Sequence, residues 1–94
     1  MEQVREEMAA KQVFRELTGA LGHRGLVFGW ARGTNAVWCR NARPGKKRLL
    51  EINGNQVRFL NMDQLYIDDR TLETIHRRIR QVVAEFTFAR PTRG

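Results

Sequence analysis

The spacing of hydrophobic positions changes along the chain, and its first segment has the period of a helix. In residues 2–20, apolar side chains recur three and four positions apart, which is typical of an amphipathic helix. These apolar positions are Ala10, Val13, Phe14, Leu17 and Leu21. Gly19 and Gly22 then provide the residue type that most often ends a helix. The pattern predicts a first helix at about residues 1–22, with one buried stripe.

The middle of the chain, residues 25–67, has the short apolar runs and turn residues of a β-meander. Residues 26–31 and 36–40 flank a polar turn and predict a first hairpin. Residues 47–52 and 55–61 flank Asn53-Gly54, a dipeptide that favours a type I′ turn. Pro44-Gly45 breaks the pattern between the two hairpins. Four strands are expected, and residues 61–67 form either a fifth short strand or an extended approach to the last helix.

The last periodic segment, residues 69–87, has the most regular apolar stripe. The stripe consists of Leu72, Ile75, Ile79, Val82 and Phe86. Asp68 or Asp69 is expected to cap this helix at its amino end. The spacing also fits a coiled-coil seam, but two heptads are too short to hold one alone, so packing on the sheet is favoured. Residues 88–94, which contain Pro91 and Gly94, are expected to be a loose tail.

Together these segments predict a single α+β domain over residues 1–94, in the order α-β-β-β-β-α. A chain of 94 residues supports one compact core and is too short for two. Two helices with one apolar stripe each would cover one face of the antiparallel meander and leave its other face open to solvent.

The predicted turns also assign side chains to the two faces of the sheet. With Asn53-Gly54 as the central turn residues, Leu50 lies opposite Val57, and Arg48 lies opposite Phe59. The predicted core side consists of Leu50, Ile52, Val57 and Phe59, and the predicted exposed side includes Lys47, Leu49 and Arg58.

In the first hairpin, pairing Ala31 with Ala36 places Trp38 over Gly29, with Arg40 on the same face. The other face of this hairpin, the predicted core side, carries Phe28, Trp30, Val37 and Cys39. An indole beside guanidinium groups can stack on exposed bases while the charges hold phosphates. The alternative is that Trp38 packs against a terminal helix or loop.

The net charge of +7 is concentrated in the middle of the chain. Residues 20–60 contain eight basic residues and one acid, Glu51, whereas the rest of the chain contains nine of each. Charge of one sign repels itself, so its concentration indicates a partner of opposite sign. The candidate binding residues are Trp38, Arg40, Arg43, Lys46, Lys47, Arg48 and Arg58, five of which lie in the basic hairpin tip at residues 40–48.

The sequence contains none of the usual patterns of a catalytic, metal or cofactor site. Its one cysteine, Cys39, and its two histidines, His23 and His76, have no recurrent ligand spacing. We therefore expect no enzyme, no metal and no cofactor, and a ribonuclease that uses a histidine with arginines is the weakest alternative. The unpaired cysteine, the acidic start and the lack of a long apolar run favour a cytoplasmic protein without membrane contact.

These observations favour a small nucleic-acid-binding or nucleic-acid-associated regulatory protein, with DNA and RNA both left open. The alternative is a protein-interaction module, an adaptor or inhibitor that docks its positive face on an acidic surface of a larger partner. Trp38, Leu49 and Leu60 would then be the anchors. A homodimer is compatible with either function.

Overall fold

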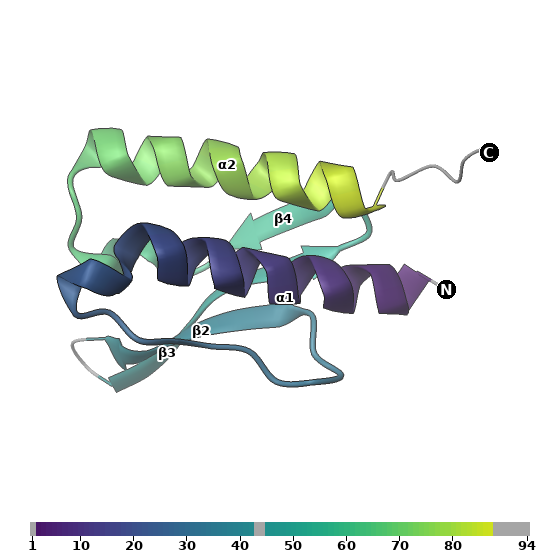
Figure 1. Ribbon diagram of the computed structural model, residues 1–94, viewed down its shortest axis with the longest axis horizontal. Coiled ribbons are helices and arrows are strands. Elements are labelled where there is room, and N and C mark those ends of the chain that lie inside the picture. Colours follow the sequence, from purple (N-terminus) through teal and green to yellow (C-terminus); the bar gives the residue numbers. More distant parts are fainter. Residues whose placement is uncertain (1, 43–44, 88–94) are drawn as a thin grey trace.

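The computed structural model describes residues 2–42 and 45–87, and the order of its elements is the predicted one (Figure 1). Helix α1 (Glu2–Leu21) continues into the short 3-10 helix η1 (Gly22–Arg24), and a second 3-10 helix, η2 (Met62–Leu65), precedes helix α2 (Asp69–Thr87). The four strands between them are β1 (Phe28–Gly29), β2 (Ala36–Ala42), β3 (Gly45–Asn53) and β4 (Gln56–Phe59). They form one antiparallel sheet in chain order, which confirms the predicted α+β meander.

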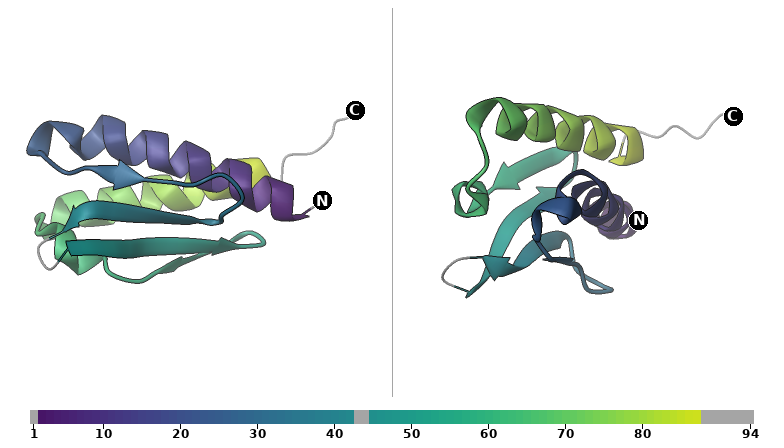
Figure 2. Two further views of the ribbon diagram at one scale, coloured as in Figure 1. Left: turned by 90° about the horizontal axis from the view of Figure 1, so that it is seen from below. Right: turned by 60° about the vertical axis from the view of Figure 1, so that its left-hand side comes forward.

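Both helices lie on the same face of the sheet, as predicted (Figure 2). Helix α1 contacts β1, β2 and β3, whereas α2 packs beside α1 and contacts β4. No described element covers the other face, which is called the open face below. The region left undecided by the sequence, residues 61–67, forms η2 instead of a fifth strand, and the expected tail at 88–94 lies outside the described residues.

The core lies between the helices and the covered face of the sheet, and it contains the predicted stripes. Helix α1 contributes Ala9, Ala10, Val13, Leu17 and Leu21, and helix α2 contributes Ile75, Ile79, Val82 and Val83. The sheet contributes Phe28, Val37, Cys39, Leu50 and Ile52. Removing a large apolar side chain from water stabilises the fold by roughly 1.5 to 3 kcal/mol, so these stripes determine which faces meet.

Asp68, and not Asp69, caps helix α2. Its Oδ2 accepts a 3.0 Å hydrogen bond from the Thr71 amide, and its Oδ1 accepts a 2.7 Å hydrogen bond from the Thr71 hydroxyl. These bonds, the hydroxyl bond first, lower the pKa of the Asp68 carboxyl because they favour its charged form. Helix α1 ends at Leu21, within the predicted limits, and the left-handed residue that follows it is Gly25 (φ 85°).

The first hairpin has the predicted register, with Phe28 opposite Cys39 and Gly29 opposite Trp38. The Asn41 side chain holds the segment before β1 against the end of β2. Its Oδ1 accepts a 2.9 Å hydrogen bond from the Val27 amide, and its Nδ2 donates a 2.8 Å hydrogen bond to the Gly25 carbonyl. With these two hydrogen bonds, β1 needs only two residues paired with β2 to hold this edge of the sheet.

The register of the second hairpin differs from the prediction. Leu50 pairs with Phe59 and Ile52 with Val57, so the two central turn residues are Gly54 and Asn55. Among them only Gly54 has a positive φ, 62°, as a type II′ turn requires. Glu6 of α1 accepts a hydrogen bond from the Gly54 amide and so holds the turn in this position. Moving the turn by one residue shifts the register by two, so the predicted core side is retained.

A β-bulge at Leu49 corrects the predicted exposure of β3. Val37 lies opposite Leu50, but the next residue of β2, Trp38, lies opposite Arg48, so Leu49 is an extra residue in this strand pair. In a bulge the alternation of side chains is interrupted. Leu49 and Leu50 are consequently both buried, each with 0% of its surface exposed. The prediction that Leu49 is exposed was wrong.

The bulge also reverses the predicted sides of the residues that precede it in β3. Arg48, expected on the core side, lies opposite Trp38 on the open face, and Lys46 lies on the same face two residues away. Lys47, expected on the exposed side, lies opposite Cys39 on the face that the helices cover. A second irregularity lies between Cys39 and Ala42. It returns β2 and β3 to the register that they have on the other side of the bulge, so Ala42 pairs with Gly45.

His76 packs helix α2 against β4 through its ring. The imidazole stacks on Phe59 with ring centroids 4.0 Å apart and an interplanar angle of 25°. Its Nε2 is enclosed and has no hydrogen-bond partner among the described residues. Burial lowers the pKa of His76 because it disfavours the imidazolium, and the charge of Arg80 lowers it further.

The bulge predicts that Leu49→Ala lowers the free energy of unfolding by about 2 to 5 kcal/mol, as expected for truncating a fully buried leucine. Val27→Ala is the control, because Val27 lies in the same sheet region with 49% of its surface exposed. Its effect should stay within about 1 kcal/mol. Urea denaturation measures both values, and a Leu49→Ala effect as small as that of the control would contradict the bulge.

The environment of His76 predicts that stability falls as the pH is lowered through 6.5, the ordinary pKa of histidine. Below this value the unfolded chain takes up a proton that the folded imidazole binds less readily, so the free energy of unfolding decreases. His76→Phe keeps the stack on Phe59 and removes the titration. Urea denaturation between pH 7.5 and 5 should give a flatter profile for this variant, and parallel profiles would rule the explanation out.

Candidate nucleic-acid interface

Trp38 lies on the open face because β2 alternates between the core and solvent. Val37 and Cys39 are buried on the covered face, and Trp38 between them is half-buried on the other. Two cations lie near its indole: Lys46 Nζ is 5.3 Å from the ring centroid and Arg48 Cζ is 5.7 Å from it. Each such contact stabilises an exposed site by only about 0.5 to 1 kcal/mol. The indole is thus the centre of a cationic surface.

A hollow of about 230 Å³ lies beside this indole. Its lining consists of Gly29, Trp30, Ala31, Trp38, Arg40 and Lys46. Gly29 is opposite Trp38, as predicted, and the stem of Arg40 lies over it, since a Cβ at Gly29 would be 3.1 Å from Arg40 Cδ. Trp30 contributes to this lining, but its indole packs against the core: Nε1 donates a 3.2 Å hydrogen bond to the Thr34 carbonyl, and Lys11 Nζ of α1 is 5.8 Å from the ring centroid.

The charge on the open face is mostly positive. Its described basic residues, Arg40, Lys46, Arg48 and Arg58, are all exposed. One carboxylate, Glu51, lies among them on β3: its Oε2 accepts a hydrogen bond from Arg48 Nη1, and its Cα partner across the ladder is Arg58. Exposed ion pairs contribute little to stability, so Arg48 can exchange this carboxylate for another anion at small cost.

Three acids of helix α1 bind groups other than these open-face cations. Glu6 accepts from the Gly54 amide, and Glu7 Oε2 accepts a 2.7 Å hydrogen bond from the Gly33 amide. Glu16 forms a two-pronged ion pair with Arg78 of α2, at 2.9 and 3.1 Å. These carboxylates therefore do not neutralise the surface around Trp38.

The structure brings together four of the seven predicted binding residues: Trp38, Arg40, Lys46 and Arg48. Arg58 shares their face but lies on the outer strand β4, beside Glu51. Lys47 is on the covered face, and Arg43 lies outside the described residues. The prediction that Trp30 lies on the core side is confirmed, since this half-buried side chain packs against the core.

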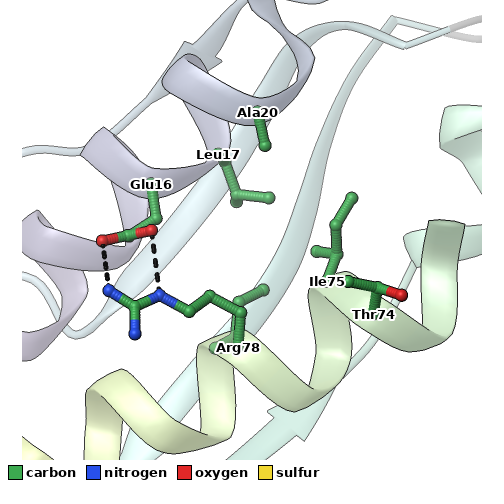
Figure 3. Close-up of a pocket in the computed structure, with 7 residues that line it drawn as sticks. Glu16, Leu17, Ala20, Thr74, Ile75 and Arg78 are labelled. Carbon is green, nitrogen blue, oxygen red and sulfur yellow. Dashed lines mark hydrogen bonds and ion pairs between the residues drawn. The ribbon is translucent and has the colours of Figure 1, made fainter.

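A second hollow, of about 140 Å³, lies between the two helices (Figure 3). Leu17, Ala20, Ile75 and Ile79 give it an apolar lining. The charged residues at its edge, Glu16 and Arg78, bind each other, and this bonding lowers the pKa of the Glu16 carboxyl. The hollow therefore lacks an unpaired charge to attract a polyanion, in contrast to the one beside Trp38.

The described residues contain no cluster of three or more potential metal ligands of the His, Cys, Asp and Glu types. No helix in the part of the chain that the structure describes has the length and apolar character needed to cross a membrane. His23 is exposed in η1, and His76 is stacked on Phe59, so neither contributes to the surface around Trp38.

Comparison of the chain with protein-family models, with curated proteins and with solved structures found no match. The functional assignment is therefore based on the geometry of the open face. Its main features are an indole, a hollow beside it and exposed cations around both.

Proposed function

We propose that this chain is a small nucleic-acid-binding protein that contacts phosphates through the open face of its sheet. The supporting observation is the position of Arg40, Lys46 and Arg48 around one half-buried indole, on a face that the helices leave uncovered. Concentrated cations release counterions when they bind a phosphate backbone, and this release is the main source of sequence-independent affinity.

The chemistry of these side chains fits a polyanion better than an isolated carboxylate. A guanidinium presents paired donors that bind two oxygens of one phosphate, and the lysine ammonium acts as a compact charge. Strand β2 places Arg40 two residues from Trp38, and strand β3 places Lys46 two residues from Arg48, so the cations lie in rows along the sheet. Such rows can follow successive phosphates of one strand.

This proposal predicts that Arg40→Gln, Lys46→Gln and Arg48→Gln together weaken oligonucleotide binding at least tenfold at low salt. The slope of log affinity against log salt concentration should also decrease by about two to three, because each phosphate contact contributes about 0.9 to it. Fluorescence anisotropy with labelled mixed-sequence DNA and RNA measures both quantities.

The matched control neutralises three exposed arginines of the helices: Arg15, Arg70 and Arg77. It lowers the net charge by the same amount but should leave most of the affinity and slope intact. Equal losses in both triple variants would refute a specific surface. Absence of oligonucleotide binding by the unmodified protein at low salt would refute the function, and capture of an acidic protein in its place would favour a protein-docking module.

Glu51→Gln is expected to strengthen oligonucleotide binding, whereas the triple variant weakens it. The change removes the carboxylate that pairs with Arg48 and borders Arg58, so both guanidinium groups become free for phosphate. Affinity for the same oligonucleotides should rise severalfold at low salt, with a salt slope steeper by up to about one. Unchanged or weaker binding in a variant with normal thermal stability would show that these arginines do not contact phosphate.

A further inference from the structure

We infer that the hollow beside Trp38 holds one unpaired base, which makes single-stranded nucleic acid, and not duplex, the ligand class of this protein. The inference rests on the proposed function and identifies its substrate. It is carried by the indole of Trp38 beside the hollow, and by the cations Arg40 and Lys46 in the same lining.

The first supporting feature is the aromatic surface of Trp38. In a duplex the faces of the bases are covered by their neighbours in the stack, so an indole can stack only on a base that is unpaired. Phosphate binding alone requires cations and makes no use of an aromatic plane. Trp38 lies on the open face among Arg40, Lys46 and Arg48, which is the combination of stacking platform and charged groove that single strands use.

The second supporting feature is the size and shape of the hollow. Pockets for drug-sized ligands have volumes of roughly 300 to 1,000 Å³. The hollow, at about 230 Å³, is smaller and has room for one flat ring system. Reading a duplex through its major groove requires a helix or ribbon that protrudes into the groove. A concave site beside an indole instead receives a group that protrudes from the ligand.

The third supporting feature is the glycine at the floor of the hollow. Gly29 lies in a strand and does not have the left-handed φ that would require glycine for the backbone. Its missing side chain leaves room for the stem of Arg40 at the floor of the hollow: a Cβ there would come within 3.1 Å of Arg40 Cδ and 3.3 Å of Arg40 Cγ. A larger residue would displace Arg40 and occupy the floor of the hollow.

Base binding is also compatible with the cations that now lie near Trp38. Lys46 and Arg48 are long, exposed side chains, at 5.3 and 5.7 Å from the ring centroid. A stacked base interacts more strongly with an aromatic ring than an exposed cation does. The base can therefore take the place of one cation at the ring, and the released cation can turn to the adjacent phosphate.

The test compares three ligands of one mixed sequence at one salt concentration: single-stranded DNA, single-stranded RNA and the DNA duplex. Fluorescence anisotropy should show at least tenfold tighter binding of a single strand than of the duplex. Tryptophan fluorescence should be quenched by the single strands, because a base stacked on Trp38 changes the environment of its indole. Preference for either DNA or RNA supports the inference and indicates whether a 2′-hydroxyl is contacted.

Two variants test the hollow without changing the net charge. Trp38→Leu removes the aromatic plane, and Gly29→Val fills the floor while leaving Trp38 and every cation in the sequence. Each should reduce single-strand affinity about tenfold and change duplex affinity less than about threefold. Gln56→Val is the control, because it adds a branched side chain at an exposed position of β4 that does not line the hollow. Circular dichroism and thermal unfolding verify that each variant is folded.

The outcomes distinguish this inference from the proposed function. Equal affinity of the unmodified protein for single strand and duplex would overturn the inference and leave the proposed function standing. A single-strand preference that both folded variants retain would overturn it as well. Failure to bind any of the three ligands at low salt would remove the proposed function and this inference with it.

Discussion

The open face depends on one extra residue in β3. Leu49 and Leu50 are consecutive apolar residues, and strict alternation would leave one of them in solvent. The bulge buries both, and burial of a leucine contributes roughly 1.5 to 3 kcal/mol. It also places Arg48 opposite Trp38, with Lys46 on the same face. Packing of the core on one side of the sheet thereby determines the chemistry of the other side.

The acids of helix α1 and the cations around Trp38 lie in different parts of the molecule. Glu6 and Glu7 of α1 accept hydrogen bonds from amides at the turns of the two hairpins, Gly54 and Gly33, and Glu16 joins α1 to Arg78. These acids hold elements together on the covered side. The cations around Trp38 have one described carboxylate on their own face, so most of their charge is available to a ligand.

The sequence predicted the elements well because helices and short strands differ in period. The register of the first hairpin could also be predicted, because the position of its turn places Gly29 opposite Trp38. The register of the second hairpin could not be predicted, because Asn53-Gly54-Asn55 allows two different turns. The turn that forms is accompanied by a contact with Glu6, which is distant in the sequence. The bulge could not be predicted by alternation, which it interrupts. As a result Leu49, Arg48 and Lys47 were each assigned to the wrong face.

The adjacent cations Lys47 and Arg48 allow the most direct test of the account, because they differ by one position and lie on opposite faces. Neutralising each one separately to glutamine changes the net charge equally. The account predicts that Arg48→Gln weakens the binding of a single-stranded oligonucleotide severalfold, as loss of one phosphate contact should, whereas Lys47→Gln leaves the affinity within about twofold. Equal effects of the two changes, or a larger effect of Lys47→Gln, would contradict it.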